Sequence, residues 1–193
     1  MSAEERLADR RERLILAAYT LFASPGFHAT TIERLCATAR ISNRAFYECF
    51  SGREALMRAV YDRCVEETLQ AITKAIDQAP PELDARIVAG ITEYVKFVTA
   101  DERRARIMHL EVRRAGDVLS NARQRAVLDF TKIIEGTVND LPVHQPTELH
   151  LLSLALIGAV TELLIEWVVS DHPPATEVIV KTAVHVFRRA FIR

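Results

Sequence analysis

Residues 30–50, with the sequence TTIERLCATARISNRAFYECF, have the pattern of two short helices that follow each other closely. A first short helix is predicted from Thr30, which precedes a glutamate by three residues in capping-box spacing, to about Ala39. A second begins at Ser42, its expected N-cap, and ends near Phe50. Two short helices joined by a tight link form a helix-turn-helix, whose second helix lies in the major groove of DNA.

The second helix carries the side chains that we expect to read bases. Phe46 and Phe50 are four residues apart and should face the core, which leaves Asn43, Arg44 and Tyr47 on the other side. Arginine forms a bidentate hydrogen-bond pair with guanine, and asparagine forms one with adenine. We therefore expect these three side chains in the major groove, with Arg44 as the best candidate for a guanine contact.

Phosphate contacts are expected from the neighbouring helix ends. Thr31 offers a hydroxyl beside the free N–H groups of a helix start, and Ser42 offers a second hydroxyl. Arg53 lies in the first turn of the next helix, where a cation opposes the helix dipole and favours an external anion. Arg40 lies in the link between the two helices. It either only alters the shape of the turn or also contacts the DNA backbone.

The rest of the chain is helical in pattern, with apolar residues at spacings of three and four. Six glycines and seven prolines are too few for an all-β fold, and no alternating run predicts a strand. Leu141-Pro142 and Pro146 bracket a predicted loop. About nine helices are predicted, over residues 5–23, 30–39, 42–50, 51–76, 87–98, 101–114, 118–138, 147–170 and 175–192. Ser51 and Glu54 have capping-box spacing at the start of the fourth, and Asp101 is the expected cap of the sixth.

Charge and cysteine content permit a nucleic-acid partner in a reducing compartment. The 193 residues carry a net charge of −1, but residues 1–58 hold nine Lys and Arg against seven Asp and Glu, a net of +2, which leaves −3 for the remainder. Three lone cysteines and the absence of a signal-peptide pattern favour the cytoplasm. Residues 149–169 are apolar, but they include Glu162 and Glu166, which argues against a membrane crossing.

A helix that is apolar on all sides is normally buried, and residues 149–169 carry two apolar stripes. Together with residues 175–192 they would form a two-helix face that pairs with a second copy by two-fold symmetry. The alternative is an intramolecular core. The sequence therefore predicts a homodimer through the last two helices and leaves that alternative open.

Residues 11–60 resemble the DNA-binding domain of the TetR family of transcriptional regulators. Three segments depart from the usual pattern: Arg40 replaces a turn glycine, Asn43-Arg44-Ala45 replaces a Lys-Gly-Thr-like start, and Glu48-Cys49 replaces a pair of histidines. The changed recognition helix implies an operator of its own. The matching landmarks are RLILAAYTLF (13–22), Gly26-Phe27, ATTI (29–32), Ile41-Ser42, Phe46-Tyr47, Phe50 and REAL (53–56).

The resemblance implies a DNA-binding domain over residues 1–52 and a ligand-binding, dimerising domain over residues 53–193. It also implies a repressor that binds palindromic double-stranded DNA and is released by a small-molecule effector. An effector pocket is expected among the central helices, although each candidate residue also suits an ordinary core or surface position. The candidates are Tyr94, Phe97, Met108, His109, Phe130, Glu162, Glu166 and Trp167.

Other function classes find less support in the sequence. No glutamate has a histidine three residues later, and the chain contains no GxSxG, P-loop or HExxH motif. We therefore expect no enzymatic activity, metal or cofactor. A helical protein-interaction adaptor would account for the C-terminal half but not for the capped short helices of residues 30–50.

Overall fold

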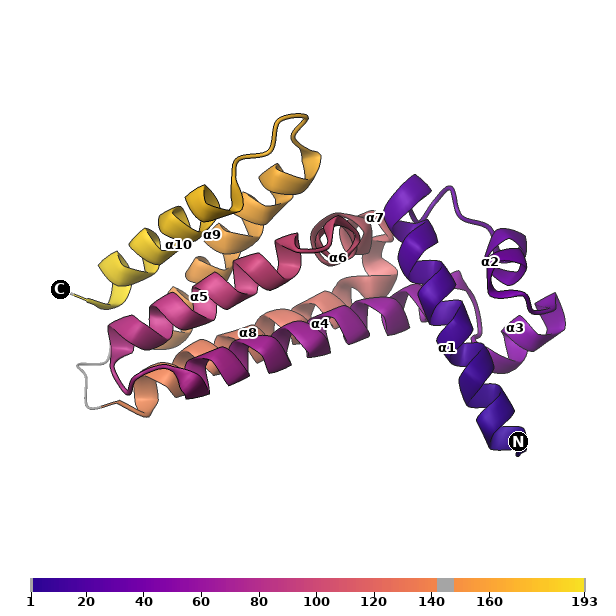
Figure 1. Ribbon diagram of the computed structural model, residues 1–193, viewed down its shortest axis with the longest axis horizontal. Coiled ribbons are helices and arrows are strands. Elements are labelled where there is room, and N and C mark those ends of the chain that lie inside the picture. Colours follow the sequence, from indigo (N-terminus) through magenta and orange to yellow (C-terminus); the bar gives the residue numbers. More distant parts are fainter. Residues whose placement is uncertain (1, 142–147, 193) are drawn as a thin grey trace.

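The computed structural model describes residues 2–141 and 148–192, and within these ranges the chain is all-α (Figure 1). Three helices gather near the N-terminus: α1 (Ala3–Leu21), α2 (Ile32–Ala39) and α3 (Asn43–Cys49). The π-helical turn η1 (Phe22–Gly26) follows α1 directly. This group is the helix-turn-helix predicted from the sequence.

The remaining helices form a longer bundle. The described part of the chain contains nine helices, as predicted, when the continuous path α6–η2–α7 is counted as one. The predicted loop at Pro142 and Pro146 lies outside the described residues. The bundle consists of α4 (Arg53–Gln78), α5 (Leu83–Thr99), α6 (Glu102–Arg106), the π-helical turn η2 (Ile107–Glu111), α7 (Val112–Arg114), the 3-10 turn η3 (Gly116–Leu119), α8 (Ser120–Asn139), α9 (Leu149–Val169) and α10 (Thr176–Phe191).

Two of the predicted helix caps are wrong. Thr31, and not Thr30, caps α2 by accepting a hydrogen bond from the N–H of Arg34. Thr30 is fully buried, and its hydroxyl donates to carbonyl oxygens of the preceding segment. The start of α4 follows Gly52 and has no side-chain cap, so the predicted capping box at Ser51 does not form. Ser42, by contrast, caps α3 as predicted.

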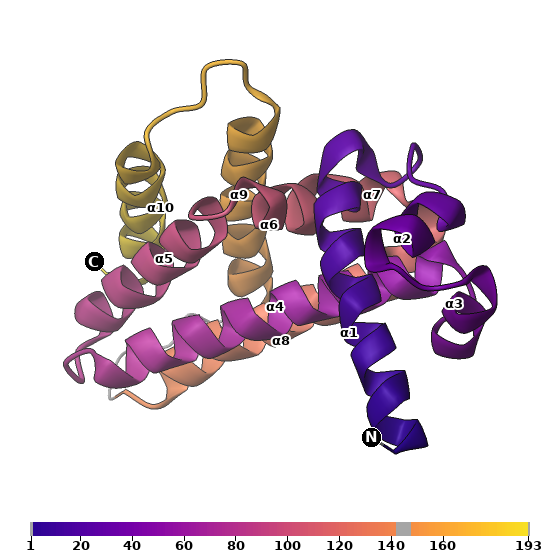
Figure 2. The same ribbon diagram turned by 45° about the vertical axis from the view of Figure 1, so that its right-hand side comes forward.

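The helix-turn-helix group lies across one end of the bundle (Figures 1 and 2). The first helix α1 packs on α2, α3 and α4, and the long helix α4 continues away from this junction beside α5 and α8. The last two helices, α9 and α10, pack on each other and cover α8 and α5 respectively. The bundle therefore has one end at the helix-turn-helix group and a distal end where α4 turns into α5.

Helix α9 is the one described helix that is long and apolar enough to span a membrane by composition. It is a core helix of this fold, because it packs on α8, α10, α6 and η2. Leu156, Val160 and Leu164 lie on its buried side. Its opposite side is exposed, and Leu151 and Val169 there are 59% and 52% accessible to solvent.

Candidate functional site

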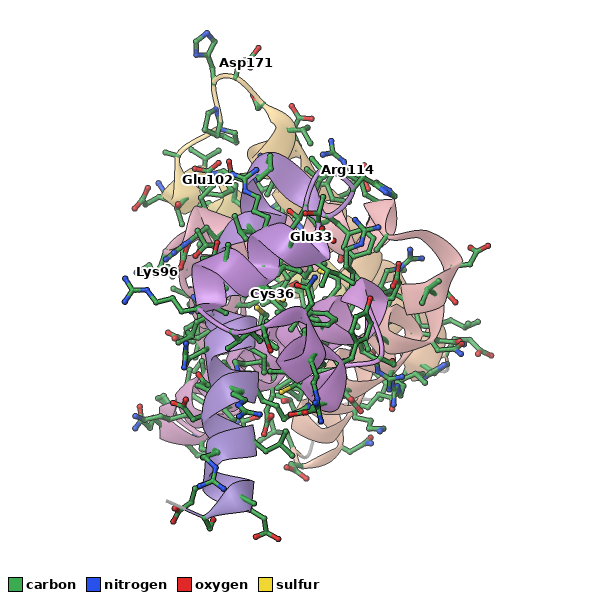
Figure 3. The ribbon with its side chains drawn as sticks, turned by 90° about the vertical axis from the view of Figure 1, so that its right-hand side faces the viewer. Glu33, Cys36, Lys96, Glu102, Arg114 and Asp171 are labelled. Carbon is green, nitrogen blue, oxygen red and sulfur yellow. The ribbon has the colours of Figure 1, made fainter. Side chains whose placement is uncertain are left out.

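The third helix presents three side chains to solvent at the outer end of the molecule. Asn43, Arg44 and Tyr47 are exposed, and the Arg44 side chain is 92% accessible. Phe46 on the opposite side is completely buried against the core of the domain. Because the apolar side anchors α3, the polar side is free to enter a groove of DNA. Figure 3 views the molecule from this end.

The turn between α2 and α3 contains a left-handed residue. Arg40 has φ 54° and ψ 51°, and it is the one described non-glycine residue with positive φ. This conformation lets the N–H of Ile41 reach the carbonyl of Cys36 at 3.0 Å, which closes the end of α2. A side chain in this region costs about 1–2 kcal/mol relative to ordinary helical backbone. Arg40 therefore occupies the position at which glycine is favoured, and its side chain is exposed.

Two arginines of α1 secure the C-terminal ends of the other two helices. Arg13 donates to the carbonyl oxygens of Ala39 and Arg40 at the end of α2. Arg11 donates to the carbonyl of Cys49 at the end of α3, and its guanidinium lies 4.3 Å from the ring centroid of Phe50. Cations are favourable at helix C-termini, so these side chains hold the helix-turn-helix together.

Arg53 has a similar inward role in the structure. Its guanidinium donates to the carbonyl of Thr30 at 2.7 Å and lies 5.0 Å from the ring centroid of Phe27. The half-buried side chain thus bridges the start of α4 and the segment before α2. A phosphate contact from Arg53 stays a prediction. It requires an N–H group of the guanidinium that does not already bind these carbonyl oxygens.

A carboxylate lies among the cations of the DNA-facing surface. Glu48 accepts a hydrogen bond from Arg10 at 2.9 Å and pairs with Arg44 at 3.4 Å. All three side chains are exposed, so each pair contributes only weakly to stability. Glu48 nevertheless restrains the arginine that we expect to read a base.

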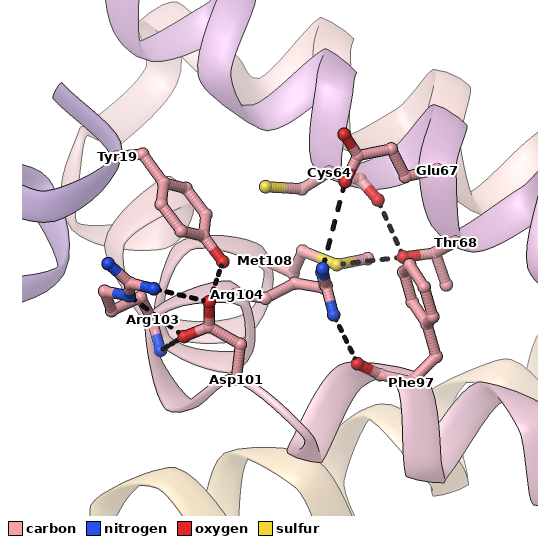
Figure 4. A network of polar contacts seen from close by, with 9 residues as sticks. All are labelled: Tyr19, Cys64, Glu67, Thr68, Phe97, Asp101, Arg103, Arg104 and Met108. Atoms are coloured by element: carbon pink, nitrogen blue, oxygen red, sulfur yellow. Dashed lines mark hydrogen bonds and ion pairs between the residues drawn. The ribbon is translucent and has the colours of Figure 1, made fainter. Parts of the chain in front are cut away.

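Polar contacts join the helix-turn-helix group to the bundle at α6 and η2. Tyr19 of α1 donates to Asp101 at 2.9 Å, and Asp101 also caps α6 and binds Arg103 (Figure 4). These hydrogen bonds lower the pKa of Asp101, while burial and the bond to Asp101 raise the pKa of Tyr19. Beside them, Arg104 donates to the carbonyl of Phe97 at 2.6 Å. The tyrosine is therefore held as a neutral donor to an ionised partner.

The most buried contact of this junction involves Glu111, which is 1% accessible. Its carboxylate accepts a hydrogen bond from the N–H of Phe27 at 2.9 Å and pairs with Arg114 at 3.1 Å. Gly26, with φ +109°, passes so close that a Cβ atom there would lie 3.2 Å from the same carboxylate. Glu111 belongs to the π-helical turn η2, and π-helical turns are frequent at functional positions.

A cavity of about 90 Å³ lies in the bundle between α4, α5, α8, α9 and α10. Its wall is almost entirely aliphatic and aromatic. Of the predicted effector contacts, Tyr94 and Phe130 line it, with ring centroids 5.3 Å apart. The described residues that complete the wall are Ile72, Ile76, Leu83, Arg86, Ile87, Gly90, Ile91, Ile133, Ile134, Thr137, Val138, Ile157, Val160, Phe187 and Phe191.

The structure does not bring the other predicted effector residues to this wall. Phe97 lies under Arg104, and Met108 contacts the hydroxyl of Thr68. His109 is buried beside Tyr94, with its ring centroid 6.4 Å from that of the tyrosine. Burial lowers the pKa of His109 to about 3, so its imidazole is neutral.

The three remaining predicted effector residues lie on α9. Glu162 and Glu166 are exposed, and Trp167 is half-buried against the core. Of the described wall residues that were not predicted, Arg86 is the charged one, and a lone arginine on an amphipathic helix has the pattern of an ordinary surface charge.

The sequence and the fold both match known regulators. Residues 14–60 match the family described as bacterial regulatory proteins, tetR family. The HTH-type transcriptional activator FasR of Mycolicibacterium smegmatis is 25% identical over 100 residues, which is 52% of this chain and 45% of that protein. The chain thus spans less than half the length of this relative.

Two solved structures have the same fold over nearly the whole chain. The fatty acid degradation regulator FadR from Bacillus halodurans superposes with a TM-score of 0.80 at 16% identity, covering 92% of this chain and 93% of that one. The transcriptional regulator FadR from Bacillus subtilis, in complex with stearoyl-CoA, gives 0.79 at 14% identity, covering 91% and 96%. Residues 14–60 therefore match the DNA-binding domain of the tetR family, and nearly the whole chain has the fold of these two regulators.

Proposed function

We propose that the protein is a homodimeric, cytoplasmic repressor that a small-molecule effector releases from a palindromic operator. The observation that carries the proposal is the apolar cavity, which lies in the same bundle that contacts the helix-turn-helix group through Glu111 and Asp101. Residues 1–52 would form the DNA-binding domain, and residues 53–193 would form the effector and dimerisation domain.

Asn43, Arg44 and Tyr47 are proposed to read bases because they share the exposed side of α3. Thr31 and Ser42 each cap a helix at this surface, so their hydroxyls and the adjacent N–H groups suit phosphate oxygens. Arg40 and Arg53 are proposed as further phosphate contacts. Of the seven, Arg53 has the least freedom, because backbone carbonyls already bind its guanidinium.

The exposed side of α9 and α10 is proposed as the dimer interface. It carries Leu151, Val169 and Val178, each more than half accessible in the single chain. Gly158 lies on the same side, and a Cβ atom there would meet nothing within 4 Å, so a partner helix has room to approach closely. An apolar surface of this kind normally marks an interaction site. Sedimentation as a monomer at micromolar concentration would contradict this assignment.

The effector is proposed to carry a long acyl chain. The B. subtilis FadR structure contains stearoyl-CoA, and the cavity of this chain is lined mainly by aliphatic side chains. A volume of about 90 Å³ is small for such a ligand. The acyl ligand would therefore bind to a state of the protein in which the surrounding helices have separated. A ligand with higher affinity for that state shifts the population toward it.

Release would follow if this expanded state holds the two helix-turn-helix groups at a spacing that no longer matches operator half-sites one DNA turn apart. A transcriptional activator is the second candidate, because FasR is named as one. Transcription in vitro from an operator to which the protein binds, with and without the protein, distinguishes repression from activation.

The decisive experiment selects bound duplexes from a random pool and then measures their affinity for wild type and Arg44→Ala. We expect the variant to lose about 1–3 kcal/mol of specific binding and to relax the preference at one base pair. Equal losses on operator and random DNA would reduce Arg44 to a phosphate contact. Binding of no duplex at low salt would favour the adaptor alternative.

A further inference from the structure

The cavity has one charged side chain among the described residues of its wall. Arg86 lies near the start of α5, whereas the other wall residues are apolar apart from Thr137 and Tyr94. The hydroxyl of Thr137 donates to the carbonyl of Ile133 within its own helix. A lone cation in an otherwise apolar wall gives the two ends of the cavity different chemistry.

The Arg86 side chain has an unused donor. Its Nε atom is buried without a hydrogen-bond partner, although the residue as a whole is partly accessible to solvent. The nearest carboxylate in the sequence, Asp84, binds Arg188 of α10 instead, with a contact of 2.7 Å. Buried polar groups are normally hydrogen-bonded, so a donor left in this position favours an acceptor supplied by a ligand.

Farther along α5, the rings of Tyr94 and Phe130 line the cavity. Tyr94 and Phe130 pack against each other, and behind Tyr94 lies the buried, neutral His109 of η2. Eight residues of α5 separate Arg86 from Tyr94, which corresponds to roughly 12 Å along a helix. The Arg86 end of the cavity is therefore distal, and the Tyr94 end lies toward the turn that holds Glu111 and the helix-turn-helix group.

We propose that Arg86 binds the acyl oxygen at the head of an aliphatic effector, whose chain then runs along α5 and ends against Tyr94. This inference rests on the proposed acyl effector and adds its orientation and its polar contact. A carboxylate of a free fatty acid and the carbonyl of an acyl thioester both present such an oxygen. Because Arg86 is partly accessible, a head group larger than the acyl oxygen can extend into solvent.

The test measures binding to the full-length protein by titration calorimetry. The ligands are dodecanoate, dodecanoyl-CoA and dodecyltrimethylammonium, which share one chain and differ at the head. We expect Arg86→Met to weaken binding of the acyl ligand by roughly 10- to 100-fold, the range of a charge-assisted hydrogen bond. Dodecyltrimethylammonium should bind wild type more weakly than the acyl ligand, and Arg86→Met should remove this preference.

Arg125→Met is the matched control, because Arg125 is an exposed arginine of α8 that does not line the cavity. We expect it to bind the acyl ligand as wild type does. If Tyr94→Phe weakens binding and Arg86→Met does not, the head lies at the other end and the inference is overturned. The acyl ligand that binds, the free acid or the thioester, identifies the source of the acyl oxygen.

Two further outcomes separate this inference from the proposed function. If an acyl ligand binds Arg86→Met as tightly as wild type and still releases DNA, the assignment of Arg86 fails while the acyl effector stands. If neither acyl ligand binds wild type or changes operator affinity, both fail. Equal melting temperatures of the variants and wild type show that the affinities refer to folded protein.

Discussion

Replacement of Glu111 tests how the helix-turn-helix group is held on the bundle. The carboxylate is 1% accessible and accepts the N–H of Phe27, a residue that is itself 2% accessible. Glu111→Ala leaves that donor buried without a partner. Loss of a hydrogen bond to a charged acceptor costs about 1.5–3 kcal/mol, and the truncation leaves a small void in addition. We therefore expect the free energy of unfolding to fall by about 3 kcal/mol.

Glu111→Gln separates the hydrogen bond from the charge. The amide keeps an acceptor oxygen for Phe27 but loses the ion pair with Arg114, which is 52% accessible and can be hydrated by water. A salt bridge with one exposed partner contributes little, so we expect a loss of about 1 kcal/mol. Glu102→Ala is the control, since the Glu102 side chain is 70% accessible and 4.0 Å from Arg106.

The assay is urea unfolding followed by circular dichroism, with operator affinity measured in parallel with and without effector. Glu111→Ala should lower the unfolding midpoint and also reduce the effect of the effector on operator affinity, because the junction is loosened. Unfolding of Glu111→Ala and Glu102→Ala at the same midpoint would contradict this role of Glu111. Loss of stability with unchanged effector response would limit Glu111 to a structural role.

Three further changes have signs that the structure determines. Arg40→Gly should raise the free energy of unfolding by up to about 1 kcal/mol in thermal unfolding, because glycine adopts a φ of 54° without the Cβ penalty. Glu48→Ala frees Arg10 and Arg44 and should tighten binding to random DNA. The slope of log affinity against log salt concentration should steepen by about 0.9 for each of these arginines that reaches a phosphate. An unchanged slope would contradict this prediction. His109 has its pKa lowered to about 3 by burial, so the unfolded chain binds more protons below the ordinary value of 6.5. Stability should therefore fall as the pH drops below 6.5, by up to about 1.4 kcal/mol per pH unit, and His109→Leu should flatten that part of the profile in urea titrations.

Local signals in the sequence predicted the helices well, because periodicity and helix caps act over three or four residues. Ser42 caps α3 and Asp101 caps α6 as expected. The error at Thr30 arose because two adjacent threonines offered similar capping patterns. Only packing against α1 and η1 decides between them, since it buries Thr30 and leaves Thr31 at the helix start.

The lining of the cavity was predicted less well than the helices. Tyr94 and Phe130 line the cavity, but Phe97 and Met108 lie elsewhere although they share the same apolar character. A helical pattern shows that a residue faces inward, but it does not show which neighbours from distant helices leave a gap there. Arg86 escaped notice for the same reason, because its sequence context is that of a surface residue.

The all-α fold, the helix-turn-helix and the side of α3 that faces solvent could be predicted from the sequence, because each depends on spacings within a few residues. The tertiary structure alone decided the roles of the arginines around that helix. Arg11, Arg13 and Arg53 bind carbonyl groups brought from segments 23–38 residues away, whereas Arg44 stays exposed. A guanidinium binds whichever acceptor the fold places within reach, and that acceptor is set by chain segments far apart in the sequence.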